Sequence, residues 1–448
     1  MEVCTIGGYE YVGNNMTAVK VGEDVFLFDV GVNIPSLIEM QGDEIAHKQS
    51  EEKLRRYQAI PNDLVLDDLG WKNKVKAIFI GHAHLDHVGG VPWVAHRYPN
   101  AKIYGTAFTT NFLKTIITDE KLSMTNKIIT VEENSTHEIK GTSGTYKIDF
   151  IKATHSTIQC SFLALHTSDG IFFYALDFKM DDTPVIGEKP NYAKLKEIGK
   201  EGAKVLVVNS LYSGAKGRTE SEFIAHERVK KAIASVEKDR KGALFISTFS
   251  SHIVRLHSII EFARKTGREI VILGRSMDKY ISCAIKSKQW TIKDKLKIAK
   301  YRAHVNSTLK RVNQDRGRYL VICTGHQAEV GSILDRIVKE ETPFIFEKGD
   351  NVIFSSKVIP VEENLEARRK MDNTLKNKGV IIQDNVHVSG HGSQDDIRML
   401  IEMVKPEHII PTHGYPAQEM PAIELAKKLG YKEGKTVYLS QDGKVLKF

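Results

Sequence analysis

Cysteine is scarce in this sequence, and so are the features that direct a protein into or across a membrane. No apolar run reaches the ~18 residues that a membrane span requires, so we expect no membrane partner. The first residues lack a basic segment followed by an apolar one, and we therefore expect no secretory signal and a cytoplasmic protein. The cysteines form no CxxC pair, which excludes a zinc knuckle or redox motif of that kind, and we expect all of them to be small buried residues: Cys4, Cys160, Cys283 and Cys323.

The composition indicates neither a disordered tail nor a scaffold of repeats. Hydrophobic residues make up 41% and charged residues 27% of the chain, which is typical of a soluble globular protein. A length of 448 residues allows two or three domains with ample core. A dinucleotide-binding fingerprint is also absent, because Gly7-Gly8 does not belong to a GxGxxG motif, and we interpret it as a turn.

The net charge of +8 is concentrated in one stretch. Between Lys286 and Arg318 there are eleven basic residues and two acidic ones, which leaves the rest of the chain close to neutral. Trp290 and Tyr301 lie among these charges, as in surfaces that bind phosphates and stack bases. A solvated basic face without a partner is the alternative for this stretch taken alone.

A cluster of metal-ligand residues directly follows the apolar run 77–80. Alternation predicts that His82, His84 and Asp86 lie on one side of the exit from a buried strand, and the turn into Gly89-Gly90 brings His87 to join them. Imidazole suits Zn²⁺ and Mn²⁺, and an added carboxylate can bring a second cation near the first. The sequence therefore predicts a metal site at this strand end, with a histidine-rich surface loop as the alternative.

Further ligand-type residues follow other predicted strands. Asp29 ends the run 25–28, His155 follows the run 148–151, and Asp177 ends the run 171–176. Two more turns near the C-terminus, 387–393 and 411–414, carry histidines after apolar segments. Because α/β layers bind ligands beyond their strand ends, several strands that deliver His and Asp to one edge are consistent with a single metal site.

The middle of the chain has a different pattern. Continuous apolar strands alternate there with helical or basic segments and carry no ligand cluster: 205–208, 243–246, 270–273 and 319–322. We expect charged helical segments at 39–57 and 362–378, and after Gly90 a helix through Trp93 to Tyr98.

These motifs resemble those of known metal-dependent enzymes. The 82–87 cluster with His155, Asp177 and His413 resembles the metallo-β-lactamase fold of dinuclear hydrolases. The turn His387-Val388-Ser389-Gly390-His391 resembles the β-CASP nuclease branch, and together with residues 248–251 and 274–277 it is similar to the ribonuclease J family. This resemblance implies an α/β fold, a metallo-β-lactamase αββα sandwich with an inserted α/β β-CASP domain. The implied domains are 1–207, 208–360 as the insertion, and 361–448. The insertion would cover the metals and form an RNA channel.

The resemblance also implies a role for each motif residue and two divalent cations per chain, Zn²⁺ with Mn²⁺ as the alternative. One ion would be held by His82, His84 and His155, and the other by Asp86, His87 and His413. Asp177 would bridge the two ions. Two cations about 3.5 to 4 Å apart can activate a water and neutralise the charge of an in-line displacement at phosphorus.

The remaining implied roles concern positioning and substrate. Asp29 would orient the metal ligands from outside. The turn of His387, Val388, Ser389, Gly390 and His391 would hold the scissile phosphate, and His391 would be the proton donor. The catalytic residues in this account are His391, Asp86 and Asp177.

The resemblance implies a metal-dependent ribonuclease that acts mainly as a 5′–3′ exonuclease on 5′-monophosphorylated single-stranded RNA, in RNA decay and maturation. The histidine at 413 favours RNA, because related DNA-directed enzymes tend to carry an apolar residue there. A β-CASP endoribonuclease of the RNA 3′-processing type is the alternative. A thioesterase or lactonase would leave the turn at 387–391 unexplained, and a non-enzymatic RNA-binding module would leave seven metal-type residues unexplained.

The sequence departs from the family pattern in places. Asn209 stands where an acidic residue is often found, so no carboxylate role is assigned there. The chain stops soon after Asp442, without the extra C-terminal domain of bacterial members, so oligomerisation is open, with a homodimer as one alternative. Arg275 and Ser276 at a helix start, and His326 in a loop, are candidate RNA contacts with structural roles as alternatives.

Overall fold

The computed structural model describes residues 1–42, 50–292, 296–358 and 362–448. These residues form two compact units. Unit 1 comprises 1–182, 189–219 and 390–448, and unit 2 comprises 183–188 and 220–389. Unit 1 is therefore built from both ends of the chain, and we describe each unit separately.

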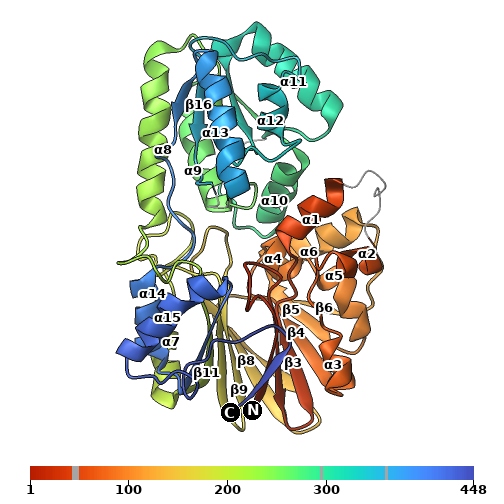
Figure 1. Ribbon diagram of the computed structural model, residues 1–448. Helices are drawn as coiled ribbons and strands as arrows, with labels where there is room; N and C mark the ends of the chain where they lie inside the picture. The colour runs from red at the N-terminus through yellow and green to blue at the C-terminus, as the bar shows by residue number, and fades with distance from the viewer. Residues whose placement is uncertain (43–49, 293–295, 359–361) are drawn as a thin grey trace. The chain divides into compact units, whose positions relative to one another are not determined.

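Two sheets form the centre of unit 1 (Figure 1). The first has the order β19-β1-β2-β3-β4-β5-β6 and the second the order β18-β11-β10-β9-β8-β7. The strands of the first are β1 (Glu2–Gly7), β2 (Met16–Val21), β3 (Asp24–Phe28), β4 (Val75–Phe79), β5 (Lys102–Thr106), β6 (Ile128–Val131) and β19 (Lys444–Lys447). Those of the second are β7 (Ser135–Lys140), β8 (Thr145–Lys152), β9 (Ser161–Thr167), β10 (Gly170–Ala175), β11 (Ala203–Asn209) and β18 (His408–Thr412).

Strand alternation explains why these sheets stack. In β10, Phe172 and Tyr174 face a core shared with Phe26, Phe28 and Phe79 of the first sheet. The intervening side chains of β10 point to the opposite face, where they pack against helices. Because both faces are covered, the strand is apolar throughout, as the sequence predicted for a buried strand.

Helices cover the outer face of each sheet, which gives the αββα layers expected from the resemblance (Figure 1). The second sheet is covered by α7 (Tyr192–Glu201), α14 (Gln394–Val404) and α15 (Pro416–Lys428). The helices beside the first sheet are α1 (Ile34–Gly42), α2 (Glu51–Arg56), α3 (Val65–Asp68), α4 (Leu85–Val88), α5 (Val91–Val94) and α6 (Ala107–Asp119). Short 3₁₀ turns occur at Lys72–Lys74 and Ala95–Arg97.

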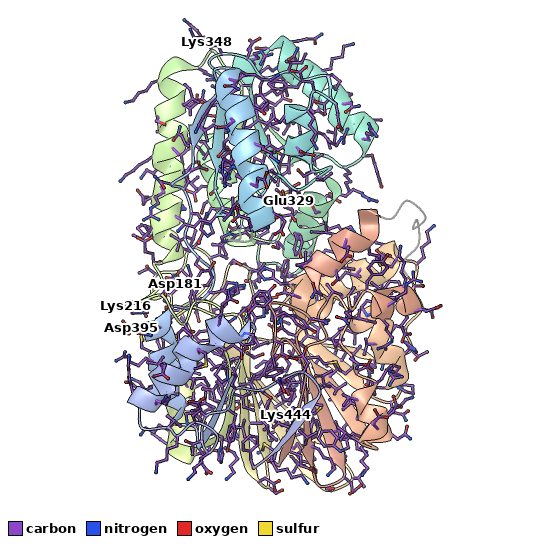
Figure 2. The ribbon with its side chains drawn as sticks, viewed as in Figure 1. Asp181, Lys216, Glu329, Lys348, Asp395 and Lys444 are labelled. Atoms are coloured by element: carbon purple, nitrogen blue, oxygen red, sulfur yellow. The ribbon has the colours of Figure 1, made fainter. Side chains whose placement is uncertain are left out.

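The C-terminal strand returns to the N-terminus. β19 pairs antiparallel with β1, so that Lys444 lies beside Thr5 (Figure 2). β18 is likewise inserted beside β11 in parallel register, with Thr412 opposite Asn209. Two strands from the end of the chain thus complete the sheets started by its beginning.

Unit 2 contains one parallel sheet with the order β14-β13-β15-β12-β16-β17. Its strands are β12 (Leu244–Ser247), β13 (Glu269–Leu273), β14 (Lys297–Ala299), β15 (Tyr319–Cys323), β16 (Asn351–Phe354) and β17 (Ile381–Gln383). Its helices are α8 (Glu222–Val236), α9 (Ile253–Arg264), α10 (Arg275–Lys286), α11 (Arg302–Gln314), α12 (Ile333–Val338) and α13 (Glu362–Asn377), with 3₁₀ turns at Glu237–Asp239 and Arg316–Arg318. One face packs on α11, α12 and α13, as Phe245, Leu309 and Leu375 share a core.

Most predicted elements are present, with shifted ends. The segment 39–57 contains the end of α1 and all of α2, while 43–49 lie outside the described residues. The helix predicted after Gly90 begins at Val91, as expected, and is replaced after Val94 by a 3₁₀ turn. All four cysteines are free and buried, as predicted. Among the described residues, no helix is long and apolar enough to cross a membrane.

Candidate metal centre and phosphate-binding turn

The second sheet of unit 1 brings several polar side chains to one edge. β10, β11 and β18 run parallel, and β8 runs in the same direction because β9 is antiparallel to both β8 and β10. Their carboxyl ends therefore meet at the same edge. His155, Asp177, Asn209 and His413 lie at or just beyond these ends.

The first sheet contributes the remaining candidates. Asp29 follows β3, and His82 follows its parallel neighbour β4. The chain then makes a single helical turn, α4, in which Asp86 and His87 are adjacent residues. The predicted strand-like alternation thus ends at His84, and a helical turn presents the last two ligands.

A glycine permits this turn to pack closely. A Cβ atom at Gly31 would lie 1.7 Å from the carbonyl oxygen of Asp86, so no larger residue fits there. The backbone N–H groups of Val30 and Val32 donate to carbonyls of α4 at 2.8 and 3.1 Å. The loop after β3 therefore fixes the backbone that carries Asp86 and His87.

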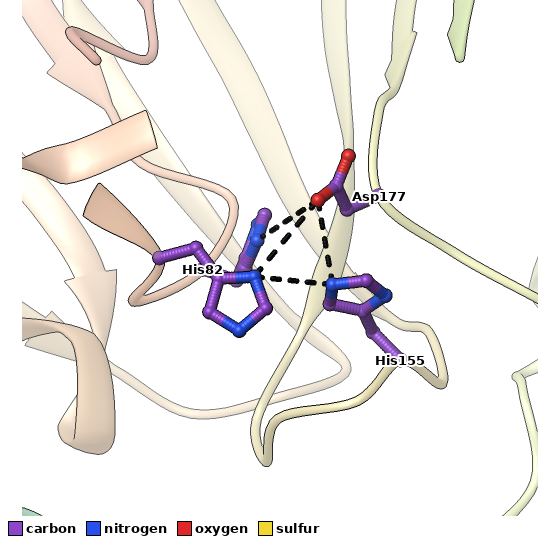
Figure 3. Close-up of side chains that lie close together, drawn as sticks. His82, His155 and Asp177 are labelled. Carbon is purple, nitrogen blue, oxygen red and sulfur yellow. Dashed lines mark hydrogen bonds and ion pairs between the residues drawn. The ribbon is translucent and has the colours of Figure 1, made fainter. Parts of the chain in front are cut away.

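The first group of donor atoms surrounds one carboxylate oxygen, Oδ2 of Asp177 (Figure 3). His155 Nε2 lies 3.3 Å and His82 Nε2 3.5 Å from it, and His84 Nδ1 lies at 3.9 Å. His84 Nδ1 is also 3.2 Å from His155 Nε2. Three imidazole nitrogens and one carboxylate oxygen thus converge on one point.

The second group shares Asp177 with the first. His87 Nε2 lies 3.4 Å from Asp177 Oδ2 and 3.5 Å from Asp86 Oδ2. His413 Nε2 lies 3.6 Å from Asp177 Oδ1 and 3.7 Å from Asp86 Oδ2. The two groups have the membership that the resemblance implies, with Asp177 common to both.

These groups fit metal ions chemically. The donor atoms of each group all lie within 4.8 Å of one another, and most of the side chains are buried. His82 Nε2 is buried and has no hydrogen-bond partner among the described residues, although it faces the centre of its group. A buried nitrogen lone pair that lacks a donor is costly unless a cation satisfies it. Imidazole with carboxylate is a ligand set that Zn²⁺ and Mn²⁺ accept.

Hydrogen bonds fix the ring nitrogens that point away from the centre. His87 Nδ1 lies 2.7 Å from Asp29 Oδ2, and His413 Nδ1 lies 2.9 Å from Asn15 Oδ1. His155 Nδ1 lies 2.7 Å from the carbonyl oxygen of Gly390. A metal-binding histidine typically donates its second N–H in this way, which fixes its tautomer and orientation.

Two of these residues adopt a backbone conformation that is uncommon outside glycine. Asp29 has φ 55° and His413 has φ 64°. Such left-handed conformations cost about 1 to 3 kcal/mol and persist where the surroundings impose them. Here they turn a side chain at a strand end towards the shared site.

Burial and charge shift the pKa values of the cluster in different directions. Burial and the neighbouring His87 lower the pKa of His82 well below its usual value. Burial also opposes a charge on His87, but the carboxylates of Asp177, Asp86 and Asp29 outweigh it and raise its pKa. Burial acts to raise the pKa of Asp177, but nearby histidines, His391 first among them, lower it well below the usual range. The carboxylate is therefore ionised at neutral pH, as a metal ligand must be.

His391 lies beside the metal groups rather than within them. Its Nδ1 is 3.6 Å from Asp177 Oδ1, and its ring centroid is 4.9 Å from that of His155. Burial lowers the pKa of His391 to about 3. One fifth of its side chain is exposed, so the ring remains accessible from one side.

The remainder of the 387–391 turn belongs to unit 2, where a buried ion pair holds its backbone. Arg255 is fully buried and forms two bonds to Glu222, at 2.7 and 3.0 Å. The same guanidinium donates to the carbonyl oxygens of Val386 and Val388, at 2.9 and 3.5 Å. Arg228 donates to the carbonyl oxygen of His387 at 2.9 Å. The turn is therefore anchored through its backbone.

Sequence reasoning missed several of these supporting residues. Asn15, Arg255 and Glu222 carried no signal, because an isolated amide or a charge within a helix is ordinary. Asn209 was noted only as a departure from the family. It nevertheless ends a buried strand in the same way as Asp177, and that pattern could have identified it.

Two of the candidate RNA contacts, Arg275 and His326, differ in their exposure to solvent. Arg275 begins α10 and is exposed. His326 is 1% exposed, and neither ring nitrogen has a hydrogen-bond partner, while the ring of Phe249 lies edge-on at 4.0 Å.

The basic stretch 286–318 is partly neutralised by acids from elsewhere in unit 2. Lys297 and Arg318 pair with Glu269, and Lys300 pairs with Asp278. Arg316 pairs with Glu347 and with Asp350. Lys293 and Lys295 lie outside the described residues.

Layered sheets with paired His/Asp groups at one edge define a metal-dependent hydrolase. Models of three protein families match the chain: "Metallo-beta-lactamase superfamily" at 10–121, "Ribonuclease J, beta-CASP domain" at 241–373, and "Zn-dependent metallo-hydrolase RNA specificity domain" at 380–440. The protein thus combines a metallo-β-lactamase domain with a β-CASP domain.

Relatives that match nearly all of this chain support the same assignment. The chain is 36% identical to "Ribonuclease J" of Methanocaldococcus jannaschii, covering 100% of this chain and 99% of the relative. It is 38% identical to "Ribonuclease J" of Pyrococcus abyssi over 100% and 97% of the two chains. "Ribonuclease J 1" of Streptococcus pyogenes is 29% identical over 99% of this chain and 74% of that one. The chain belongs to the ribonuclease J family.

A solved structure supports the fold alone. The crystal structure of a protein of unknown function from Enterococcus faecalis V583 matches with a TM-score of 0.62 and 14% identity, covering 99% of both chains.

Proposed function

We propose that this protein degrades single-stranded RNA from its 5′ end, with a preference for a 5′-monophosphate. Membership of the ribonuclease J family makes it a metal-dependent ribonuclease. The observation that carries the hydrolytic part of the proposal is the pair of donor groups that share Asp177, because two adjacent cations suit hydrolysis of a phosphodiester bond. The direction and the end preference rest on the resemblance to ribonuclease J. We propose two ions per chain, Zn²⁺ or else Mn²⁺, and RNA decay and maturation in the cytoplasm as the setting.

Each site residue has a proposed role. His82, His84 and His155 would hold one ion, Asp86, His87 and His413 the other, and Asp177 both. Bound cations would activate a water and neutralise charge that develops on the phosphate. Asp29 would keep His87 oriented through its 2.7 Å hydrogen bond.

The turn of residues 387–391 would hold the scissile phosphate. Its residues are His387, Val388, Ser389, Gly390 and His391. The partial exposure of His391 beside Asp177 supports a role as the donor to the departing 3′ oxygen. Products would carry 5′-phosphate and 3′-hydroxyl ends.

We also propose the order of domains along the chain. Residues 1–207 and 361–448 would form the metallo-β-lactamase domain, and 208–360 the inserted β-CASP domain. The β-CASP match continues to residue 373, so the C-terminal boundary needs its own test. Limited proteolysis with mass spectrometry of the fragments would locate it.

The direction and end preference can be tested together. Purified protein with Mn²⁺ or Zn²⁺ should release labelled mononucleotides from 5′-monophosphorylated single-stranded RNA, and should do so more slowly from 5′-triphosphorylated RNA. A circular RNA of the same sequence should stay intact. Efficient cutting of the circle into long fragments would replace this proposal with the endoribonuclease alternative.

A further inference from the structure

Asn209 is the last residue of β11, and its side chain contacts both Asp177 and His391. It is 3% exposed, and β11 runs parallel to β10, the strand that leads to Asp177. Its side chain is an amide at a position where the family often has an acid. The effect of Asn209 on its neighbours depends on whether its Oδ1 or its Nδ2 faces Asp177 and His391.

One hydrogen bond fixes the orientation of this amide. The backbone N–H of Leu211 donates to Asn209 Oδ1 at 2.9 Å. A carbonyl oxygen accepts and an amide NH₂ group donates, so this bond assigns the oxygen to the Leu211 side. The NH₂ group therefore faces the site.

Both hydrogens of that NH₂ group have acceptors. Asn209 Nδ2 lies 2.8 Å from Asp177 Oδ1 and 3.3 Å from His391 Nδ1. The ionised carboxylate only accepts, so it takes one hydrogen, and the second is directed to the ring nitrogen. A ring nitrogen that accepts a hydrogen bond carries no hydrogen of its own. The neutral ring then carries its hydrogen on Nε2.

We infer that Asn209 is a positioning residue that holds His391 in the Nε2–H tautomer, so that the ring presents a hydrogen-bond donor to the substrate phosphate. This inference rests on the proposed function for the identity of the substrate, and it defines which atom of His391 acts. When the P–O3′ bond breaks, its electron pair goes to O3′. The Nε2–H group stabilises that oxygen by hydrogen bonding, and solvent water supplies the proton that ends on it. In this refinement of the proposed function, His391 is the hydrogen-bond donor to O3′ and not the source of its proton.

The magnitude of such an effect is known from other enzymes. Removal of one well-placed donor to a developing oxyanion costs about 10² to 10³ in kcat. Loss of tautomer control leaves a mixture in which part of the population still donates. We therefore expect a smaller loss, about tenfold, when Asn209 is replaced by a residue of similar size that cannot hydrogen-bond.

The tautomer itself can be measured without RNA. The ¹⁵N spectrum of Zn²⁺-loaded, histidine-labelled protein should contain one ring signal pair, absent from His391→Ala, in which Nε2 is protonated and Nδ1 is not. In Asn209→Asp the added carboxylate can only accept, so the hydrogen should move to Nδ1. A wild-type His391 with its hydrogen on Nδ1 would overturn the inference.

A double-mutant cycle tests whether Asn209 acts through His391. Asn209→Leu should lower kcat about tenfold with KM unchanged and with the same Zn²⁺ content as the wild type. In a His391→Ala background the same change should cost nothing further, because the ring that it positions is gone. Multiplicative losses, or a lower metal content, would assign Asn209 to Asp177 instead and overturn the inference. Failure of the wild type to cleave RNA would refute the proposed function while the ¹⁵N result still stood.

Discussion

The residues that follow the carboxyl ends of the strands differ between the two units. In unit 1 the carboxyl ends of the strands are followed by imidazoles and carboxylates, and in unit 2 the ends of β12, β13, β15 and β16 are followed by Thr248, Gly274, Thr324 and Ser355. Parallel strands bring their ends together in both cases. Convergence of strand ends is therefore a property of the fold, and the residue that follows each strand decides what the edge can bind.

The units also treat buried charge differently. Unit 2 pairs Arg255 with Glu222 inside the protein, and carbonyl oxygens satisfy its remaining donors. In the described part of unit 1, His82 Nε2 has no hydrogen-bond partner, and several histidines surround two carboxylates. The buried ion pair of unit 2 is satisfied by protein groups alone, whereas the His/Asp groups of unit 1 would be satisfied by bound cations.

Removal of two ligands from unit 1 should have the largest effect on activity. Asp86→Ala combined with His87→Ala should reduce kcat/KM at least about a thousandfold, because several kcal/mol of charge stabilisation are lost. Thr248→Ala, at a strand end of unit 2, provides the matched control and should leave the metal content unchanged. RNA degradation by purified double variant at the wild-type rate would contradict the assignment.

Disruption of the buried pair in unit 2 should mainly affect stability. Glu222→Gln leaves Arg255 buried with an uncompensated charge, which typically costs about 3 to 5 kcal/mol. Denaturant unfolding should show this loss. Glu220→Gln removes an exposed partner of Arg228 and should cost less than about 1 kcal/mol. Equal losses in the two variants would show that the buried pair has no special role.

The substitution Asp29→Asn tests whether Asp29 orients the candidate metal ligand His87. The amide keeps the size of Asp29 but cannot provide the ionised acceptor for His87 Nδ1, 2.7 Å away. Loss of such a partner typically costs about 10- to 100-fold in metal affinity. Calorimetric titration with Zn²⁺ should show a weakened site, and an unchanged affinity at both sites would contradict the role of Asp29.

A buried acid in unit 1 gives a smaller, pH-dependent effect. Glu419 is fully buried, and within the described parts of the chain neither carboxylate oxygen has a hydrogen-bond partner. Burial raises its pKa to about 9. Its folded pKa exceeds the unfolded one, so the stability is complete below about pH 4.5 and falls as pH rises towards 9.

Glu419→Gln should remove this pH dependence. Between about pH 5 and 8 the wild type should lose on the order of 1 kcal/mol per pH unit relative to the variant. Chemical denaturation at several pH values measures the difference. Parallel stability curves for the two proteins would contradict a neutral buried carboxyl group.

The strands and the ligands of unit 1 were predictable because they depend on local sequence. Buried strands such as β10 and β11 are apolar throughout, and the ligand-type residue after each one is visible in the sequence. The family resemblance supplied the partition of ligands into two groups. His413 illustrates its value, since 236 positions separate it from Asp177 and only the pairing of β18 with β11 brings them together.

Other features were not predictable because they depend on long-range contacts. The basic stretch gave no sign that Lys297, Lys300 and Arg318 would meet Glu269 and Asp278. The helical turn at Asp86 depends on Gly31, which lies in another loop. Orientation of the Asn209 amide depends on a backbone N–H two residues further on. Such contacts follow from packing, which residue patterns alone do not specify.

The central claim is that strand ends of unit 1 hold two cations that share Asp177. Its most direct test is the number of Zn²⁺ ions per chain in the wild type and in Asp177→Asn. Each protein is loaded with Zn²⁺ and desalted, and its metal content is measured by elemental mass spectrometry. We predict two ions per wild-type chain and at most one per variant chain. A wild type that retains none, or a variant that retains two, would contradict the claim.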